Sequence, residues 1–296
     1  PDITSAGPVA GLPDEPLHRP ATLAEAITLL RRHPEECTFV AGATDLLTML
    51  KLGTTPRGPL IDIAGLPEIS RIEPTGGVIE IGAAVTFSSI LDDPLIARHL
   101  PALRAAASLF GAVAIRNRAT LGGNLASASP AADAPPVLAA LGAAVVLAGP
   151  EGAREVPIES FFLGYRSTAR RPDEMLVRVR VPLPEEGTRQ AFFKVGTRRA
   201  QAIAKVSLAC RARLDQGGVL RNVRLAAGSV APTVLALART QAALEGKTLT
   251  PGLIREAALI ASFEVSPIDD VRSTARYRST VTGRLLARFL EELHKP

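Results

Sequence analysis

The chain has 296 residues, 47% of them hydrophobic, and a formal net charge of +5, so its length allows one large domain or two ordinary ones. Aromatic residues make up 4%, tryptophan is absent, and no basic block is interleaved with stacking side chains, so we expect no nucleic-acid partner. No apolar run reaches the roughly 18 residues of a membrane-spanning helix, and no basic segment followed by an apolar one marks a signal peptide.

Metal and disulfide chemistry have little support in the sequence. Cys37 and Cys210 lie in apolar surroundings, so we expect two buried, reduced thiols. Two thiols cannot hold an iron–sulfur cluster by themselves, and no Cys/His group has the spacing of a zinc site. We therefore expect no metal on this chain, and the absence of a disulfide pattern fits a cytoplasmic location.

The first half of the chain predicts short strands mixed with helices. Residues 1–20 are rich in proline and glycine and are expected on the surface. The capping box Thr22-Leu-Ala-Glu25 begins a helix that ends near His33-Pro34. The remaining expected elements are strands at 37–41, 60–63, 78–81 and 144–147 and helices at 45–52, 88–91, 101–110 and 135–141.

The second half predicts strands followed by helices. A strand at 174–181 has one wetter face, and Pro182 to Gly187 then breaks the pattern, so we place a domain boundary between 184 and 185. Beyond it we expect strands at 191–195, 206–214 and 223–228 and helices at 234–244, 253–263 and 276–293. In the last helix, apolar residues at steps of four predict a stripe facing a sheet, namely Tyr277, Val281, Leu285, Phe289 and Leu293. This order indicates the α+β class.

Two loops of small residues are the candidates for a binding site. Between Arg116 and Asp133, two adjacent glycines permit a sharp turn or a close approach, and short polar side chains follow at 124, 127, 129 and 133. Such groups suit a ligand with hydroxyls and phosphates, although a tight loop with self-satisfied Asx or Ser turns has the same composition. Upstream, Phe39 to Leu46 predicts a strand, a glycine turn and a helix start capped by Thr44 or Asp45.

Together the loops, about 80 residues apart, resemble the two halves of a dinucleotide cradle. Other nucleotide signatures fail. No G-x-G-x-x-G follows a strand, and Gly246-Lys247-Thr248 lacks the earlier glycine of a P-loop because Gln241 stands there.

Val40-Ala-Gly-Ala-Thr-Asp45 and Thr120-Leu-Gly-Gly-Asn-Leu-Ala-Ser-Ala-Ser-Pro-Ala-Ala-Asp133 resemble the two flavin-binding motifs of the FAD subunit of the xanthine dehydrogenase family. That family includes the carbon monoxide dehydrogenase medium chain and hydroxylases of aldehydes and N-heterocycles. The likeness continues, in order, in the segments 161–168, 193–194, 203–206 and 273–278. It implies a two-lobed FAD-binding domain of the vanillyl-alcohol-oxidase (PCMH) type at 1–184 and a CO dehydrogenase flavoprotein C-terminal-like domain at 185–296.

The resemblance also implies the cofactor and its ligands. FAD is expected to bind without a covalent bond, because neither motif contains a His or Cys. The residues implied in binding it are Phe39, Val40, Ala41, Gly42, Ala43, Thr44, Asp45, Leu46, Phe110, Ala119, Thr120, Gly122, Gly123, Asn124, Ser129, Asp133, Leu176 and Lys194. The family usually has Gly-Gly-Thr where this chain has Gly42-Ala-Thr44, and we expect binding to survive this difference.

Several of these residues have an ordinary structural role as an alternative. Asp133 is implied in accepting hydrogen bonds from sugar-like hydroxyls, but it also suits the N-cap of the helix at 135. Phe110 and Leu176 could equally be core residues. Tyr165 matches an aromatic position on the path of a nicotinamide acceptor, or it anchors its loop.

The implied function is an oxidoreductase subunit with no catalytic residue beyond the flavin. A separate molybdopterin subunit would hydroxylate the substrate, a 2Fe-2S subunit carrying two clusters would pass electrons to FAD, and FAD would deliver them to NAD or another acceptor. Gln201 and Ala202 stand where NAD-using relatives tend to carry acidic residues, so the acceptor stays open. A stand-alone FAD-dependent oxidase and a flavin-free assembly subunit of the same fold are the alternatives.

Overall fold

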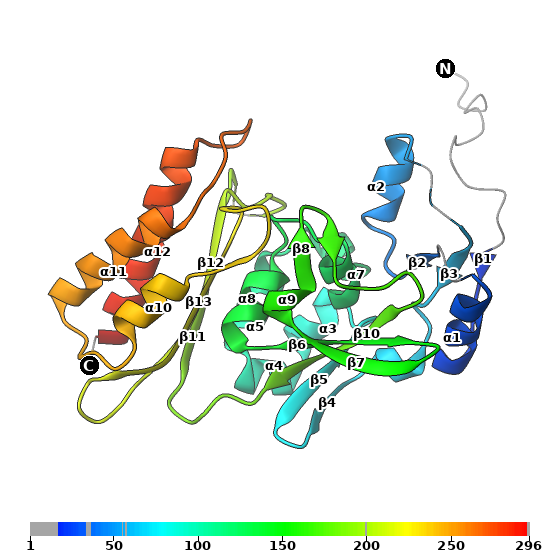
Figure 1. Ribbon diagram of the computed structural model, residues 1–296, viewed down its shortest axis with the longest axis horizontal. Coiled ribbons are helices and arrows are strands. Elements are labelled where there is room, and N and C mark those ends of the chain that lie inside the picture. The colour runs from blue at the N-terminus through cyan, green and yellow to red at the C-terminus, as the bar shows by residue number, and fades with distance from the viewer. Residues whose placement is uncertain (1–16, 34–36, 55, 57, 199, 295–296) are drawn as a thin grey trace.

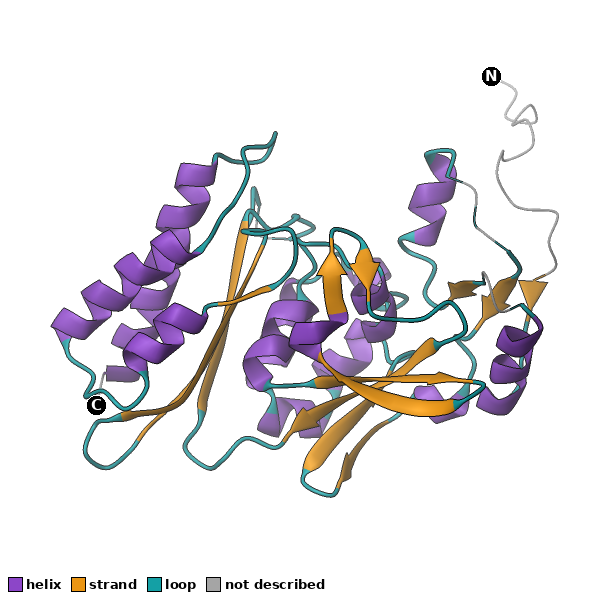
Figure 2. Cartoon of the chain, viewed as in Figure 1, coloured by secondary structure: helices purple, strands orange, loops and turns teal. Residues whose placement is uncertain are grey.

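The computed structural model describes residues 17–33, 37–54, 56, 58–198 and 200–294. Within these ranges the chain forms sheets of three, five and four strands and a separate two-stranded hairpin. Figures 1 and 2 show the sheets arranged along the long axis of the molecule, with helices between and beside them. Most of the expected surface segment 1–20 lies outside the described residues.

The N-terminal lobe is a small parallel sheet in the order β1-β3-β2, covered by one helix. The predicted cap is present in a modified form, since Thr22 Oγ1 accepts a hydrogen bond from the Glu25 backbone N–H, while the Glu25 carboxylate accepts one from Ala21, the residue before the N-cap. Apolar residues of this helix pack on the small sheet and on Met175 and Val177 of the central sheet. The elements are β1 (Leu17–His18), α1 (Leu23–Arg32), β2 (Thr38–Val40), α2 (Leu46–Lys51), β3 (Leu60–Asp62) and the 3₁₀ helix η2 (Pro67–Ile69).

The central lobe is an antiparallel sheet in the order β4-β5-β10-β6-β7. Its strands are β4 (Ile72–Thr75), β5 (Val78–Gly82), β6 (Ala144–Gly149), β7 (Gly152–Pro157) and β10 (Met175–Pro182). Its helices are α3 (Phe87–Asp92), α4 (Pro94–His99), α5 (Pro101–Leu109), α6 (Val113–Arg116), α7 (Leu121–Ala126), α8 (Ala134–Leu141) and α9 (Ile158–Phe161), followed by the hairpin β8 (Phe162–Gly164) and β9 (Ser167–Thr168).

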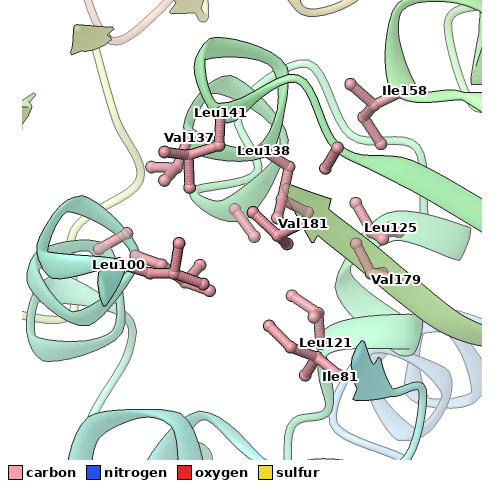
Figure 3. Close-up of a cluster of buried hydrophobic side chains, with 14 of the residues drawn as sticks. Ile81, Leu100, Leu121, Leu125, Val137, Leu138, Leu141, Ile158, Val179 and Val181 are labelled. Atoms are coloured by element: carbon pink, nitrogen blue, oxygen red, sulfur yellow. The ribbon is translucent and has the colours of Figure 1, made fainter. Parts of the chain in front are cut away.

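The core of the central lobe lies between its sheet and these helices. Figure 3 shows Ile81, Val179 and Val181 of the sheet near leucines of α7 and α8. The other face of β10 is wetter only toward its C-terminal end, where Arg178 and Arg180 form ion pairs with Glu80 of β5 and Arg180 also pairs with Glu155 of β7. The simple alternation expected for 174–181 is broken, because a register shift lies between Leu176 and Arg178: Leu176 is buried with Val179 in the central core, whereas Met175 and Val177 pack on the N-terminal lobe.

The C-terminal part is an antiparallel sheet, β11-β12-β13-β14, between two layers of helices. Helices α10, α11 and α12 cover one face, and α5 and α8 of the central lobe pack on the other (Figure 1). The elements are β11 (Arg189–Val195), β12 (Val206–Leu214), β13 (Leu220–Gly228), β14 (Leu235–Ala236), α10 (Ala238–Leu244), α11 (Pro251–Glu264) and α12 (Ala275–His294). None of the helices described is long and apolar enough to cross a membrane.

The structure corrects several sequence-based expectations. The stretch 116–133, expected as one loop, contains α7, whose first turn is capped when Thr120 Oγ1 accepts the Gly123 N–H at 3.1 Å. The segment 234–244 begins as strand β14, not as a helix, because it pairs with β13. Cys210 is buried as expected, but Cys37 is only half-buried, because it borders a cleft.

The buried face of α12 is displaced by one residue from the predicted stripe. Its centre runs through Arg278, Thr282 and Leu286, while Tyr277 is 44% exposed. The reason is that α12 packs against α11 as well as the sheet. At Gly283 a side chain would lie 2.3 Å from the Ala258 carbonyl oxygen, so the two helices approach closely.

Candidate functional site

A cleft of about 2070 Å³ opens where the three parts of the chain meet. It is bordered by segments of the N-terminal lobe, of the α5–α8 region, of the β8–β9 hairpin and of the C-terminal sheet. Every residue predicted to bind the cofactor lines this cleft except Val40, and Tyr165 lines it too. Val40 lies beside it in β2, paired with Asp62 of β3. The fold therefore brings the two predicted loops to one place.

The two loops touch at a glycine. A Cβ atom built on Gly42 would lie 1.7 Å from the carbonyl oxygen of Arg118, so no side chain fits between the loops. Gly122 has a similar role, because its Cβ would lie 2.7 Å from Ala83. At Gly123 a Cβ would have only Thr120 Oγ1 within 4 Å, at 3.0 Å. Two glycines thus permit close packing, and the third borders the open cleft.

The turn after Gly42 is strained. Ala43 has φ +58°, in the left-handed region that favours glycine. Asp45 occupies the N-cap position of α2, as one of the two predicted candidates, yet its side chain makes no capping hydrogen bond. Instead Asp45 Oδ2 lies 3.4 Å from Arg166 Nη1, at the tip of the β8–β9 hairpin. The left-handed residues Arg166, Gln201 and Ser229 border the same cleft, and such strain is concentrated at functional sites.

Asp133 and Lys194 form a buried ion pair in the wall of the cleft. Lys194 Nζ donates to Asp133 Oδ2 at 2.6 Å and to the Leu109 carbonyl oxygen at 3.1 Å. Asp133 does not cap α8; Asn124 Oδ1 instead accepts the Ala134 N–H at 3.3 Å. The second oxygen, Asp133 Oδ1, is buried and has no hydrogen-bond partner. Burial raises the pKa of Asp133, and the charge of Lys194 opposes the shift.

An unpaired carboxylate oxygen in a cleft wall is costly unless a ligand donates a hydrogen bond to it. The predicted hydroxyl-accepting role of Asp133 therefore fits the group that is left unsatisfied. Phe110 and Leu176 pack in the core as one of their alternatives predicted, and they also border the cleft. Phe110 stacks on Phe87 at 3.8 Å, and Leu176 is buried in the core, yet each also lines the cleft.

Besides Lys194, five arginines that were not predicted from the sequence line the cleft. Lys194 and the arginines at 166, 170, 198, 272 and 278 stand against three acidic residues among the described lining, Asp45, Asp133 and Asp270. Two of these arginines lie in segments already matched to the family, 161–168 and 273–278, which was the available signal. The excess of positive charge suits an anionic group such as a diphosphate.

Arg278 and Arg170 are held by backbone carbonyls. The buried Arg278 donates to the carbonyl oxygens of Lys205 and Ser229 and to Asp270 Oδ1, at 3.1, 2.8 and 2.6 Å. Arg170 donates to the Glu174 carbonyl oxygen and lies 5.7 Å from the Phe39 ring centre, and burial lowers its pKa. In the part of the chain that the structure describes, no three His, Cys, Asp or Glu side chains gather as a metal site.

Comparisons with known proteins agree with this geometry. The family model for the FAD binding domain in molybdopterin dehydrogenase matches residues 12–184, and that for the CO dehydrogenase flavoprotein C-terminal domain matches 191–293. The carbon monoxide dehydrogenase medium chain of Hydrogenophaga pseudoflava is 33% identical, over 92% of this chain and 94% of the relative. A putative xanthine dehydrogenase FAD-binding subunit of Escherichia coli K12 is 32% identical, over 93% and 94% of the two chains.

Solved structures show the same arrangement. A chain of carbon monoxide dehydrogenase from Hydrogenophaga pseudoflava aligns with a TM-score of 0.89 and 34% identity, covering 94% of this chain and 96% of that one. Quinoline 2-oxidoreductase from Pseudomonas putida 86 aligns with a TM-score of 0.88 and 29% identity, covering 95% and 97%. The predicted fold class is confirmed, and the chain belongs to the family of the FAD-binding domain of molybdopterin dehydrogenases.

Proposed function

We propose that this chain is the FAD-carrying electron-transfer subunit of a molybdenum hydroxylase. It would receive electrons from a 2Fe-2S subunit and pass them to NAD or another acceptor. The observation that carries the proposal is the convergence of two glycine-containing loops on one cleft, in a chain of this family. Several relatives are named medium chains or subunits, which supports partner subunits that carry the molybdopterin and the clusters.

The residues present in the cleft fit FAD. Asp133 Oδ1 would accept a hydrogen bond from a hydroxyl of the cofactor, and Lys194 would hold the carboxylate in place through Oδ2. The excess of arginines would balance the charge of the diphosphate. The segments 42–45 and 119–124 would line its polar parts, and Phe110 and Leu176 its apolar parts. Bound FAD supplies the redox chemistry, and the chain binds, orients and shields it.

We also propose an approach side for the electron acceptor and a boundary between the two domains. Tyr165 is 69% exposed at the rim of the cleft, and Gln201 and Ala202 line it, which is consistent with an acceptor reaching the flavin from this side. The boundary between 184 and 185 falls in the loop that joins β10 to β11. We keep the cytoplasmic location as a prediction from the cysteine content.

The test is cofactor binding by the purified chain. We expect a yellow protein with stoichiometric FAD and no turnover of purines when partner subunits are absent. Asp133→Ala and Gly123→Val should each lose the flavin spectrum. Asp92→Ala, which removes an exposed carboxylate outside the cleft, should retain it.

Other outcomes point to the alternatives. A folded chain that stays colourless after added FAD would favour a flavin-free assembly subunit. Substrate turnover by the chain without partners would favour a stand-alone oxidase. Unchanged flavin spectra in both site variants would place the cofactor elsewhere.

A further inference from the structure

We infer that Arg166 is a positioning residue that fastens the β8–β9 hairpin across both cofactor loops and thereby slows the release of FAD. The inference rests on the proposed function, and it concerns residues that face the cleft from three separate segments. The hairpin is held at its base, where the Ala169 N–H donates to the carbonyl oxygen of the buried Phe161 at 2.8 Å. Its tip, with Tyr165 and Arg166, reaches the rim of the cleft.

One residue joins the three segments. Arg166 Nη1 lies 3.4 Å from Asp45 Oδ2 in the first loop and 3.5 Å from the Ser127 carbonyl oxygen in the second. The Arg166 backbone N–H donates to the Ala128 carbonyl oxygen at 3.3 Å. These distances are long for hydrogen bonds, so each contact is weak. The two side-chain contacts share the guanidinium as donor, so losing it would release the hairpin from Asp45 and from Ser127 together, while the backbone contact with Ala128 would stay.

The backbone at the tip of the hairpin adopts an unusual conformation in this arrangement. Arg166 has φ +55°, and Ala128, which accepts its N–H, has φ +45°. Residues with a Cβ atom rarely adopt such angles and persist in them where surrounding contacts determine the conformation. The strained turn therefore directs the Arg166 side chain to Asp45, 121 positions earlier in the chain.

The Arg166–Asp45 contact should affect FAD binding through its charges. An unpaired carboxylate at position 45 would repel a diphosphate bound in the same cleft, and the Arg166 guanidinium balances it. Arginine is protonated near neutral pH in any case; hydrogen bonding to Tyr165 raises the pKa of Arg166, burial opposes this, and the charge of Asp45 raises it further. The side chains are 44% and 54% exposed, so salt should screen their attraction.

The experiment measures the release of FAD from the loaded full-length chain after dilution, by the return of free-flavin fluorescence. Arg166→Asn is the principal variant, because asparagine tolerates the left-handed backbone but cannot reach Asp45. We expect release to be about threefold to fivefold faster at low salt, the range for an exposed ion pair. At about 1 M salt, where screening acts within about 3 Å, the two rates should converge.

Matched variants separate this role from a general loss of structure. Arg171→Asn breaks an exposed ion pair of similar length, 3.5 Å to Glu151, outside the cleft, and should release FAD at the wild-type rate. Arg166→Lys should restore most of the retention. In an Asp45→Asn background, Arg166→Asn should have a much smaller effect, because the pair is already lost.

The outcomes are distinct. A release rate in Arg166→Asn equal to that of Arg171→Asn, or an effect that persists at high salt and in the Asp45→Asn background, would overturn the inference while leaving FAD binding intact. A wild-type chain that binds no FAD would overturn the proposed function, and this inference with it.

Discussion

At the scale of single residues, the buried pair Asp133–Lys194 is the most informative feature of the cleft. Both side chains are less than a tenth exposed, and one carboxylate oxygen is used by Lys194 while the other has no partner. A hydroxyl that donates to Asp133 favours its ionised form, so the bound state has a lower carboxyl pKa than the free state. Binding should therefore strengthen as pH rises through the pKa of Asp133 in the free chain, which burial holds above its ordinary value.

Asp133→Asn tests whether ionisation of Asp133 controls the affinity for FAD. We expect wild-type affinity for FAD to fall as pH is lowered toward the carboxyl range, and the variant to lose that dependence. At neutral pH the variant should bind about tenfold to a hundredfold more weakly, the value of a hydrogen bond to a charged group. Fluorescence titration of FAD over a pH series measures both, and a pH-independent wild type would contradict the assignment.

Ala43 offers a stability test at a single residue. Its φ of +58° disfavours alanine, so Ala43→Gly relieves backbone strain in the folded state but gives the unfolded chain more conformational entropy. The first effect is larger, so the free energy of unfolding should rise by about 0.5–1 kcal/mol. Ala242→Gly, in the exposed interior of α10, should instead lower it by about 1 kcal/mol. Urea unfolding of both variants gives the comparison, and equal losses would show that Ala43 is not strained.

At the scale of elements, the contact between the turn after β2 and the segment before α7 sets the geometry of the cleft. It has no room for a methyl group at Gly42, while the methyl group at Gly123 would meet only the Thr120 hydroxyl oxygen. The first glycine therefore acts through backbone packing and the second borders the site.

The two glycines should respond differently to the same substitution. Gly42→Ala must separate the loops, so we expect both a lower melting temperature and loss of FAD binding. Gly123→Ala should weaken binding with little change in melting temperature. Gly65→Ala is the control, because nothing lies within 4 Å of its added Cβ, and it should change neither. A Gly42→Ala chain as stable and as yellow as wild type would show that the loops do not touch in solution.

At the scale of the whole molecule, the C-terminal sheet and the central lobe share one core. Phe192, Ala209 and Ala226 of the sheet belong to the same buried cluster as α5 and α8. Lys194 of β11 adds polar contacts between them, since it donates hydrogen bonds to Leu109 at the end of α5 and to Asp133, the residue before α8. The cofactor cleft is thus built across the junction between the two family-model matches.

Lys194→Met should destabilise the chain by about 3 kcal/mol at neutral pH, because it leaves a buried carboxylate without its partner. Removing Lys194 raises the folded-state pKa of Asp133 further above its unfolded value. Stability of the variant is then greatest below the unfolded carboxyl pKa and is lost as pH rises toward the folded one.

The deficit relative to wild type should accordingly be small near pH 4 and grow toward pH 7, as measured by thermal unfolding across pH. Adding Asp133→Leu should recover most of the stability, because an apolar pair often replaces a buried ion pair without loss. A deficit of constant size at every pH would exclude Asp133 as its source.

Local patterns in the sequence were sufficient for much of this description. The helix start at Thr22 and the two small-residue loops each depend on neighbours within a few positions, so they could be identified without a fold. Two short strands were missed because pairing with a neighbouring strand, and not their own residue pattern, decides them. The segment 72–75 is a strand because β5 lies beside it, and 235–236 because β13 does.

The sequence by itself determined the family, the α+β class and the two loops that gather at the cleft, because motif order and periodicity are properties of the chain alone. Only the tertiary structure decided which partner each polar group takes. Asn124 rather than Asp133 caps α8, Asp45 pairs with Arg166, and Lys194 reaches Asp133 from 61 positions away. Such pairs depend on the packing of distant segments, which no local pattern encodes.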